Sequence, residues 1–157
     1  MPSLIKKFES FTGKFESPQL AILRSISLFS QIATGELRTI RGLLHQRTYI
    51  KGEIVFDEGE ETQAVYFILK GKVVIRRQGT PTDSMIAELG VGQCFGEMAL
   101  LDDSPRMAQS LCAGRAVQRR LPHPVQTHSQ IASILSLELA RMMGDRLRRQ
   151  IASGYML

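Results

Sequence analysis

The chain contains no tryptophan and only two cysteines, Cys94 and Cys112, in 157 residues. These cysteines lie far apart and form no CxxC pair, so neither a disulfide framework nor a thiolate metal site is indicated. The three histidines form no HxH or HExxH pattern, which argues against a zinc or iron site. We therefore interpret both cysteines as free thiols of a protein in the reducing cytoplasm.

Long apolar runs are absent as well. No segment approaches the roughly 18 apolar residues that are needed to cross a bilayer, so we expect no membrane span. Residues 1–18, MPSLIKKFESFTGKFESP, lack the apolar core of a secretory signal. With 43% hydrophobic and 22% charged residues and no low-complexity run, the composition predicts a folded domain with a substantial core.

Catalytic signatures are also missing from the sequence. No nucleophile–base pair and no cluster of metal-ligating residues is visible, so an enzyme is not indicated. The formal net charge of +5 favours anionic partners, such as phosphates or nucleic acid, without choosing among them.

The N-terminal part of the chain predicts helices. We interpret residues 1–19 as a helical extension to a domain formed by residues 20–157. Apolar residues of the extension share one face of a helix that we expect to end at Pro18. This face packs on the domain, or alternatively binds a partner or a membrane surface. Within the domain, Thr34 is the candidate N-cap of an amphipathic helix.

From residue 48 onward, short apolar segments alternate with glycine turns. Their spacing predicts strands of an antiparallel β-barrel or jelly roll. Residues 64–77, AVYFILKGKVVIRR, predict a hairpin that turns at Lys70-Gly71.

A long helix is expected over residues 129–154. Apolar residues recur there every four positions, which predicts a ridge that wraps slowly around the helix. We interpret three arginines near its end as cations that complement the helix dipole, namely Arg146, Arg148 and Arg149. Helices, a β-barrel and a long final helix together predict an α+β fold.

The segment CFGEMALLDDSPRMAQS, residues 94–110, carries the chemistry. Gly96 would let a ligand approach the backbone, and a short helix beginning at Glu97 would present free amides to an anion. Arg106 could clamp a phosphate. A carboxylate repels phosphate but accepts hydrogen bonds from sugar hydroxyls, so the combination indicates a nucleotide. The residues alone leave open that Glu97 and Arg106 form a surface ion pair.

FGEMALLDDSPRMA resembles the phosphate-binding cassette of cyclic nucleotide-binding domains. This family includes bacterial catabolite activator proteins, protein kinase A regulatory subunits and cyclic nucleotide-gated channels. AILRSISLFSQI, KGEIVFDEGEE and VYFILKGKVVI resemble further family motifs in the family's order, so the resemblance covers roughly residues 20–150. It implies a cupin-like jelly roll flanked by N-terminal helices and a long C-terminal helix.

The resemblance implies cAMP or cGMP as the ligand, with no further cofactor or metal. Glu97 would accept the ribose 2′-hydroxyl, and Arg106 would bind the exocyclic phosphate oxygens. Backbone amides would line the phosphate, namely those of Gly96, Glu97, Met98, Ala99 and Met107. Apolar side chains would surround base and ribose, namely Val73, Ile86, Leu89 and Leu101. The C-terminal helix would cover the base and signal to a separate effector protein by moving.

Several positions depart from the family pattern. Met107 replaces the usual Ala, Ser or Thr, Gln109 replaces a Thr or Ser, and the segment before the final helix is shortened. Because Met107 cannot hydrogen-bond a guanine amino group, cAMP is expected over cGMP. The alternative is a domain that no longer binds nucleotide and serves as a structural or protein-interaction module. No helix-turn-helix follows the long helix, so DNA binding is not expected. A homodimer that forms through the long helix is a further expectation.

Overall fold

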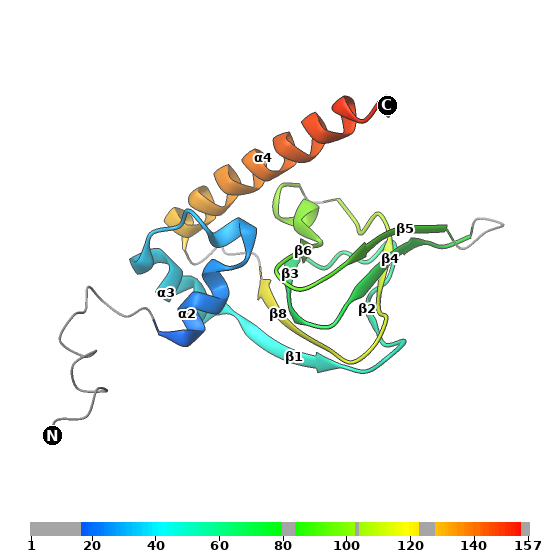
Figure 1. The fold of residues 1–157 in the computed structure, drawn as a ribbon, viewed down its shortest axis with the longest axis horizontal. Helices are drawn as coiled ribbons and strands as arrows, with labels where there is room; N and C mark the ends of the chain where they lie inside the picture. The colour runs from blue at the N-terminus through cyan, green and yellow to red at the C-terminus, as the bar shows by residue number, and fades with distance from the viewer. Residues whose placement is uncertain (1–16, 80–83, 103, 123–127, 155–157) are drawn as a thin grey trace, which may run out of the picture.

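The computed structural model describes residues 17–79, 84–102, 104–122 and 128–154. In this part of the chain, a helical layer lies at one end of a β-sandwich, and a long helix crosses above the sandwich (Figure 1). The α+β architecture matches the expected fold class. The helix expected over the N-terminal extension falls almost entirely on residues 1–16, outside the described residues.

In the described residues, three short helical elements precede the sheets. They are α2 (Pro18–Arg24), the 3-10 turn η1 (Ser27–Phe29) and α3 (Thr34–Leu43). Pro18 does not end a helix but occupies the first position of α2, where the missing N–H has no intrahelical partner to lose. The capping prediction for Thr34 is also wrong, because α3 has Ala33 as its N-cap. The Thr34 hydroxyl instead accepts a 3.1 Å hydrogen bond from Arg24 Nη2.

Antiparallel strands form two four-stranded sheets, with the orders β1-β8-β3-β6 and β2-β7-β4-β5. The strands are β1 (His45–Tyr49), β2 (Ile54–Phe56), β3 (Ala64–Lys70), β4 (Val73–Arg77), β5 (Ser84–Leu89), β6 (Cys94–Phe95), β7 (Gln109–Cys112) and β8 (Ala116–Pro122). The sheets pack face to face as a jelly-roll-like sandwich. Within the described ranges they do not close into the barrel that was the first of the two expected forms.

Strand β3 is buried on both faces. Val65 and Phe67 point into a core shared with the helices, where the ring of Phe67 lies 4.6 Å from that of Phe29. Tyr66 and Ile68 point the opposite way, into a second core between the sheets. A strand with two buried faces reads as a continuous apolar run, which is how this segment appears in the sequence.

Strands β3 and β4 do not form the expected hairpin. β4 pairs with β5 and β7 in the opposite sheet, so the chain changes sheets at Gly71. Gly71 has a φ of +85°, and a Cβ there would lie 2.5 Å from the carbonyl oxygen of Arg115. The glycine therefore serves a crossing in which two backbones approach closely, and not a two-residue turn.

The buried residues of the long helix α4 (Ser129–Ala152) all lie in its first half. Ile131, Leu135 and Leu139 are buried, whereas Leu147 and Ile151 on the same expected ridge are 44% and 59% exposed. A row with a spacing of four residues drifts around a helix, and here it leaves the core midway. The second half of α4 thus extends past the helical layer and over the sandwich (Figure 1).

Candidate functional site

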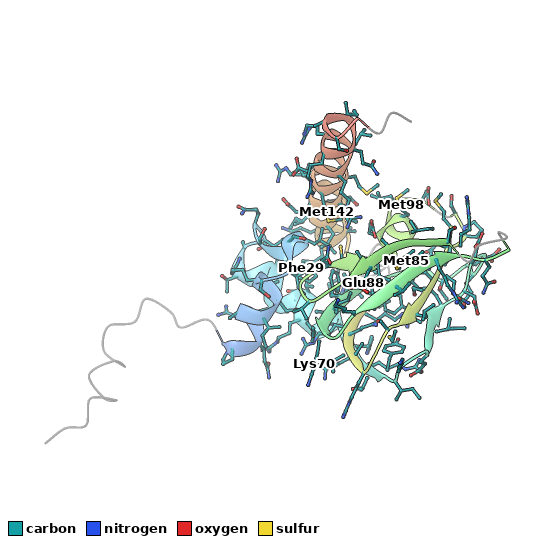
Figure 2. All side chains as sticks on the ribbon, turned by 45° about the vertical axis from the view of Figure 1, so that its right-hand side comes forward. Phe29, Lys70, Met85, Glu88, Met98 and Met142 are labelled. Atoms are coloured by element: carbon teal, nitrogen blue, oxygen red, sulfur yellow. The ribbon has the colours of Figure 1, made fainter. Side chains whose placement is uncertain are left out.

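The site is built around the turn that follows β6. Gly96 adopts the left-handed conformation, with a φ of +73°, and leads into the 3-10 turn η2 (Glu97–Leu100). Figure 2 shows Met98 on this turn, on the side of the sandwich that faces α4. A Cβ on Gly96 would lie 2.6 Å from Arg106 Nη1. Only glycine fits here, because both the backbone conformation and the space exclude a side chain.

Arg106 is buried, with 5% of its surface exposed. Its Nη1 donates a 2.8 Å hydrogen bond to the Gly96 carbonyl, and its Nη2 donates a 2.7 Å bond to the Ala64 carbonyl. The guanidinium carbon lies 4.2 Å from the centre of the Phe56 ring. Its Nε also donates a 3.4 Å hydrogen bond to the Thr62 hydroxyl. The cation is therefore held by two backbone carbonyls, a hydroxyl and an aromatic face, and each Nη keeps one further N–H that could donate to an anion.

The backbone of Arg106 is fixed as well. Its N–H donates to the Glu60 carbonyl at 2.9 Å, and its carbonyl accepts from the Gly59 N–H at 2.8 Å. Burial is the main effect on the guanidinium and lowers the pKa of Arg106, while nearby Tyr66 and Glu60 raise it. An arginine keeps its charge under such a shift, so the site holds a partly desolvated cation.

Glu97 is the second buried charge, with 7% of its surface exposed. Its carboxylate accepts a hydrogen bond from Nη1 of Arg146 on α4 and forms an ion pair with it. The structure therefore does not contain the surface ion pair of Glu97 with Arg106 that spacing left open. Sequence reasoning missed this role of Arg146, because the two residues are 49 positions apart and no local pattern connects them.

A cavity of about 540 Å³ joins these groups. Its lining includes the predicted residues Ile86, Leu89, Gly96, Glu97, Met98, Arg106 and Met107. It also includes Phe56, Ile75, Arg146 and Gln150, which the sequence did not indicate. Two predicted apolar residues lie elsewhere: Val73 is buried between the sheets, and Leu101 is 43% exposed beside the cavity. Ala99 lies within η2.

Cys94 lines the cavity and contacts α4 past the middle of the helix. Its Sγ is 3.8 Å from Sδ of Met142, and burial raises the pKa of the thiol to about 12. A thiol with so high a pKa is neutral at ordinary pH and behaves as an apolar group. In the part of the chain that the structure describes, we find no group of three or more His, Cys, Asp or Glu side chains that could hold a metal. None of the helices described is both long and apolar enough for a bilayer.

Comparison with known proteins identifies the family. Residues 46–124 match the family model of the cyclic nucleotide-binding domain. The chain belongs to this family. It is 31% identical over 99 residues to the cAMP-dependent protein kinase regulatory subunit of Mycosarcoma maydis, covering 63% of this chain and 19% of that protein. It is 34% identical over 92 residues to a cGMP-dependent protein kinase of Drosophila melanogaster, covering 57% of this chain and 10% of that protein.

The fold of this cyclic nucleotide-binding domain agrees with that of solved family members. The Thermus thermophilus catabolite activator protein superimposes with a TM-score of 0.70 at 27% identity. That match covers 81% of this chain and 61% of the other. The chain thus spans only a fraction of the length of the curated relatives it matches. The resemblance read from the cassette is confirmed at the level of family and fold.

Proposed function

We propose that this domain binds a cyclic nucleotide, with cAMP favoured over cGMP, and is a non-enzymatic regulatory module of the cytoplasm. One observation carries the proposal: the buried carboxylate of Glu97 and the buried guanidinium of Arg106 line the same cavity, on either side of Gly96. Buried charges are costly unless they have partners. Glu97 is paired with Arg146, and Arg106 with backbone carbonyls, but neither neutralises the other, so a cation and a carboxylate both remain at the cavity for a ligand that needs both.

Each part of a cyclic nucleotide finds a chemical counterpart in the cavity. Arg106 would bind the phosphate oxygens, together with the backbone amides of residues 96–99 and 107. Glu97 would accept a hydrogen bond from the ribose 2′-hydroxyl. Ile86 and Leu89 would contact the base and ribose. The cavity volume of about 540 Å³ falls within the range of small-molecule sites, about 300–1,000 Å³.

The preference for cAMP rests on Met107, which lines the cavity with 64% of its surface exposed. A thioether offers an apolar contact to either purine and no useful partner for the guanine amino group. We therefore propose that Met107 gives cGMP no higher binding affinity than cAMP.

We propose that nucleotide binding is signalled by a movement of α4. Arg146 and Gln150 of its second half line the cavity, so a ligand that enters must meet this part of the helix. The movement would be read by a separate effector protein. A homodimer through α4, and the absence of DNA binding, also stay predictions.

The second candidate function is that of a structural or interaction domain without nucleotide. The ion pair between Glu97 and Arg146 favours it, because the carboxylate that a ribose would need already has a partner. The bulk of Met107 at the cavity is compatible with the same interpretation.

Calorimetric titration with cAMP, cGMP and 2′-deoxy-cAMP separates the two functions. Under the proposal the protein binds cAMP, and Glu97→Gln weakens the binding of cAMP about ten-fold, because a hydrogen bond to a charged group contributes about 1.5–3 kcal/mol. The same substitution weakens the binding of 2′-deoxy-cAMP less than that of cAMP. Glu88→Gln is the control, because Glu88 is paired with Lys72 on the surface away from the cavity lining. A parent protein that binds none of the three nucleotides supports the interaction domain.

A further inference from the structure

Arg146 connects the second half of α4 to the cavity. Its Nη1 donates to Oε1 of Glu97, and the two side chains are 39% and 9% exposed. A buried carboxylate without a cation would be strongly unfavourable, so Arg146 compensates the burial of Glu97. The pair thus joins α4 to the cavity through a buried carboxylate.

Arg146 also stands at a boundary in the packing of α4. One turn before it, Met142 is partly buried and touches Cys94. One turn after it, Gln150 lines the cavity, while the neighbouring Leu147 and Ile151 are exposed. Among the described residues from 143 onward, the other side-chain hydrogen bonds of α4, such as Arg148 to Asp145, stay within the helix. In this described part of α4, the Arg146–Glu97 pair is therefore the side-chain hydrogen bond that joins the helix to the cavity.

We infer that Arg146 competes with the nucleotide for Glu97 and so sets the affinity of the site. The inference rests on the proposed function, in which Glu97 accepts the ribose 2′-hydroxyl. A guanidinium and a hydroxyl are both donors to the carboxylate, but the charged donor forms the stronger bond. The nucleotide can displace it because the phosphate adds its own contacts to Arg106. Displacement breaks this contact between the cavity and α4, and by linkage a protein that lacks the contact binds the nucleotide more tightly.

The pair can be tested first without any nucleotide. Arg146→Met keeps an unbranched apolar side chain and removes the charge and the donors, whereas Arg146→Lys keeps a cation. Arg148→Met is the matched control, because Arg148 lies half a turn away and forms its ion pair with Asp145 of the same helix. We expect amide hydrogen exchange of residues 146–152 to accelerate about two- to five-fold in Arg146→Met, the range for a partly exposed ion pair, and to stay unchanged in the control. Unchanged exchange in Arg146→Met overturns the role of the pair.

Titration with cAMP and 2′-deoxy-cAMP then tests competition. Arg146→Met should bind cAMP about three- to ten-fold more tightly than the parent, with Arg146→Lys in between and Arg148→Met unchanged. The gain should be absent for 2′-deoxy-cAMP, which has no hydroxyl with which to displace Arg146. Weaker binding of cAMP by Arg146→Met, or an equal gain for both nucleotides, overturns the inference.

Different results would contradict the proposed nucleotide binding and the competition by Arg146. If the parent and Arg146→Met both bind no nucleotide, the proposed function is wrong and the competition falls with it, whatever the exchange data show. If the parent binds cAMP and Arg146→Met binds it more weakly, the proposed function stands and only the competition is wrong. Binding by Arg146→Met where the parent shows none supports both.

Discussion

Arg106 Nη1 donates a 2.8 Å hydrogen bond to the carbonyl of Gly96, the residue directly before Glu97. The proposed phosphate ligand thus supports the backbone of the turn that carries the proposed ribose ligand. Arg106 is therefore expected to serve both folding and binding, and experiments on it must measure the two separately.

Arg106→Ala should weaken cAMP binding about thirty-fold or more, since truncation of a buried charged partner amounts to about 2–5 kcal/mol. It should also lower the free energy of unfolding by about 1–3 kcal/mol, because the Gly96 and Ala64 carbonyls lose their donor. Calorimetry and urea unfolding measure the two effects. Arg77→Ala, at a surface position on β4, is the control. A folded Arg106→Ala variant with the affinity of the parent would contradict the phosphate role.

Met107→Thr should raise the affinity for cGMP relative to cAMP about five-fold, the equivalent of one net hydrogen bond of about 1 kcal/mol. Competition of both nucleotides against a fluorescent analogue measures the ratio. Met107→Ala is the companion variant, which opens the cavity without adding a hydroxyl. A parent that already prefers cGMP ten-fold would refute the argument from Met107.

Gly71→Ala should destabilise the fold more than Gly79→Ala. Both residues have positive φ, +85° and +78°, so both variants share the backbone strain of about 1–2 kcal/mol. Only at Gly71 would the new Cβ meet a backbone atom, the Arg115 oxygen at 2.5 Å, whereas nothing lies within 4 Å at Gly79. We expect an additional loss of about 2 kcal/mol or more for Gly71→Ala in urea unfolding. Equal losses would show that the crossing between sheets can relax.

The free energy of unfolding should decline as the pH rises from about 9 towards 12. The Cys94 thiol has a pKa of about 12 in the folded protein against 9.0 when unperturbed, so in this window the unfolded chain releases a proton that the folded chain keeps. Stability then falls by about 1.4 kcal/mol per pH unit for each such group. Cys112 and Tyr49 contribute to the same decline of the free energy of unfolding, because burial raises the pKa of each. Cys94→Ala should show a shallower decline in urea unfolding, and an unchanged slope would contradict this assignment.

The elements of the fold could be predicted from the sequence because they depend on local patterns. Glycine turns marked the strands, and the spacing of apolar residues marked α4. The pairing of the strands could not be predicted in the same way. Lys70-Gly71 has the composition of a hairpin turn, and only the pairing of β4 with β5 and β7 shows that the chain changes sheets there.

The candidate site also combines residues that a local sequence pattern identifies with residues that only the tertiary structure brings together. Gly96, Glu97 and Arg106 lie in one short segment, and the cassette pattern identified them together. Arg146 and Gln150 come from α4, more than 40 positions later, and their presence at the cavity depends on how that helix crosses the sandwich. Charge near a helix end has an ordinary explanation in the helix dipole, so no signal in the sequence marked Arg146 as a partner of Glu97.

Because β3 contributes side chains to both cores, the helical layer and the sandwich cannot lose their order independently. Melting the helices would leave Val65 and Phe67 in water, and opening the sandwich would remove the support of the same strand. The domain is therefore expected to unfold in one cooperative transition, with helical circular dichroism and tyrosine fluorescence reporting the same midpoint. Substitutions in the distant helical core would then alter the population of molecules that are competent to bind, without touching the cavity.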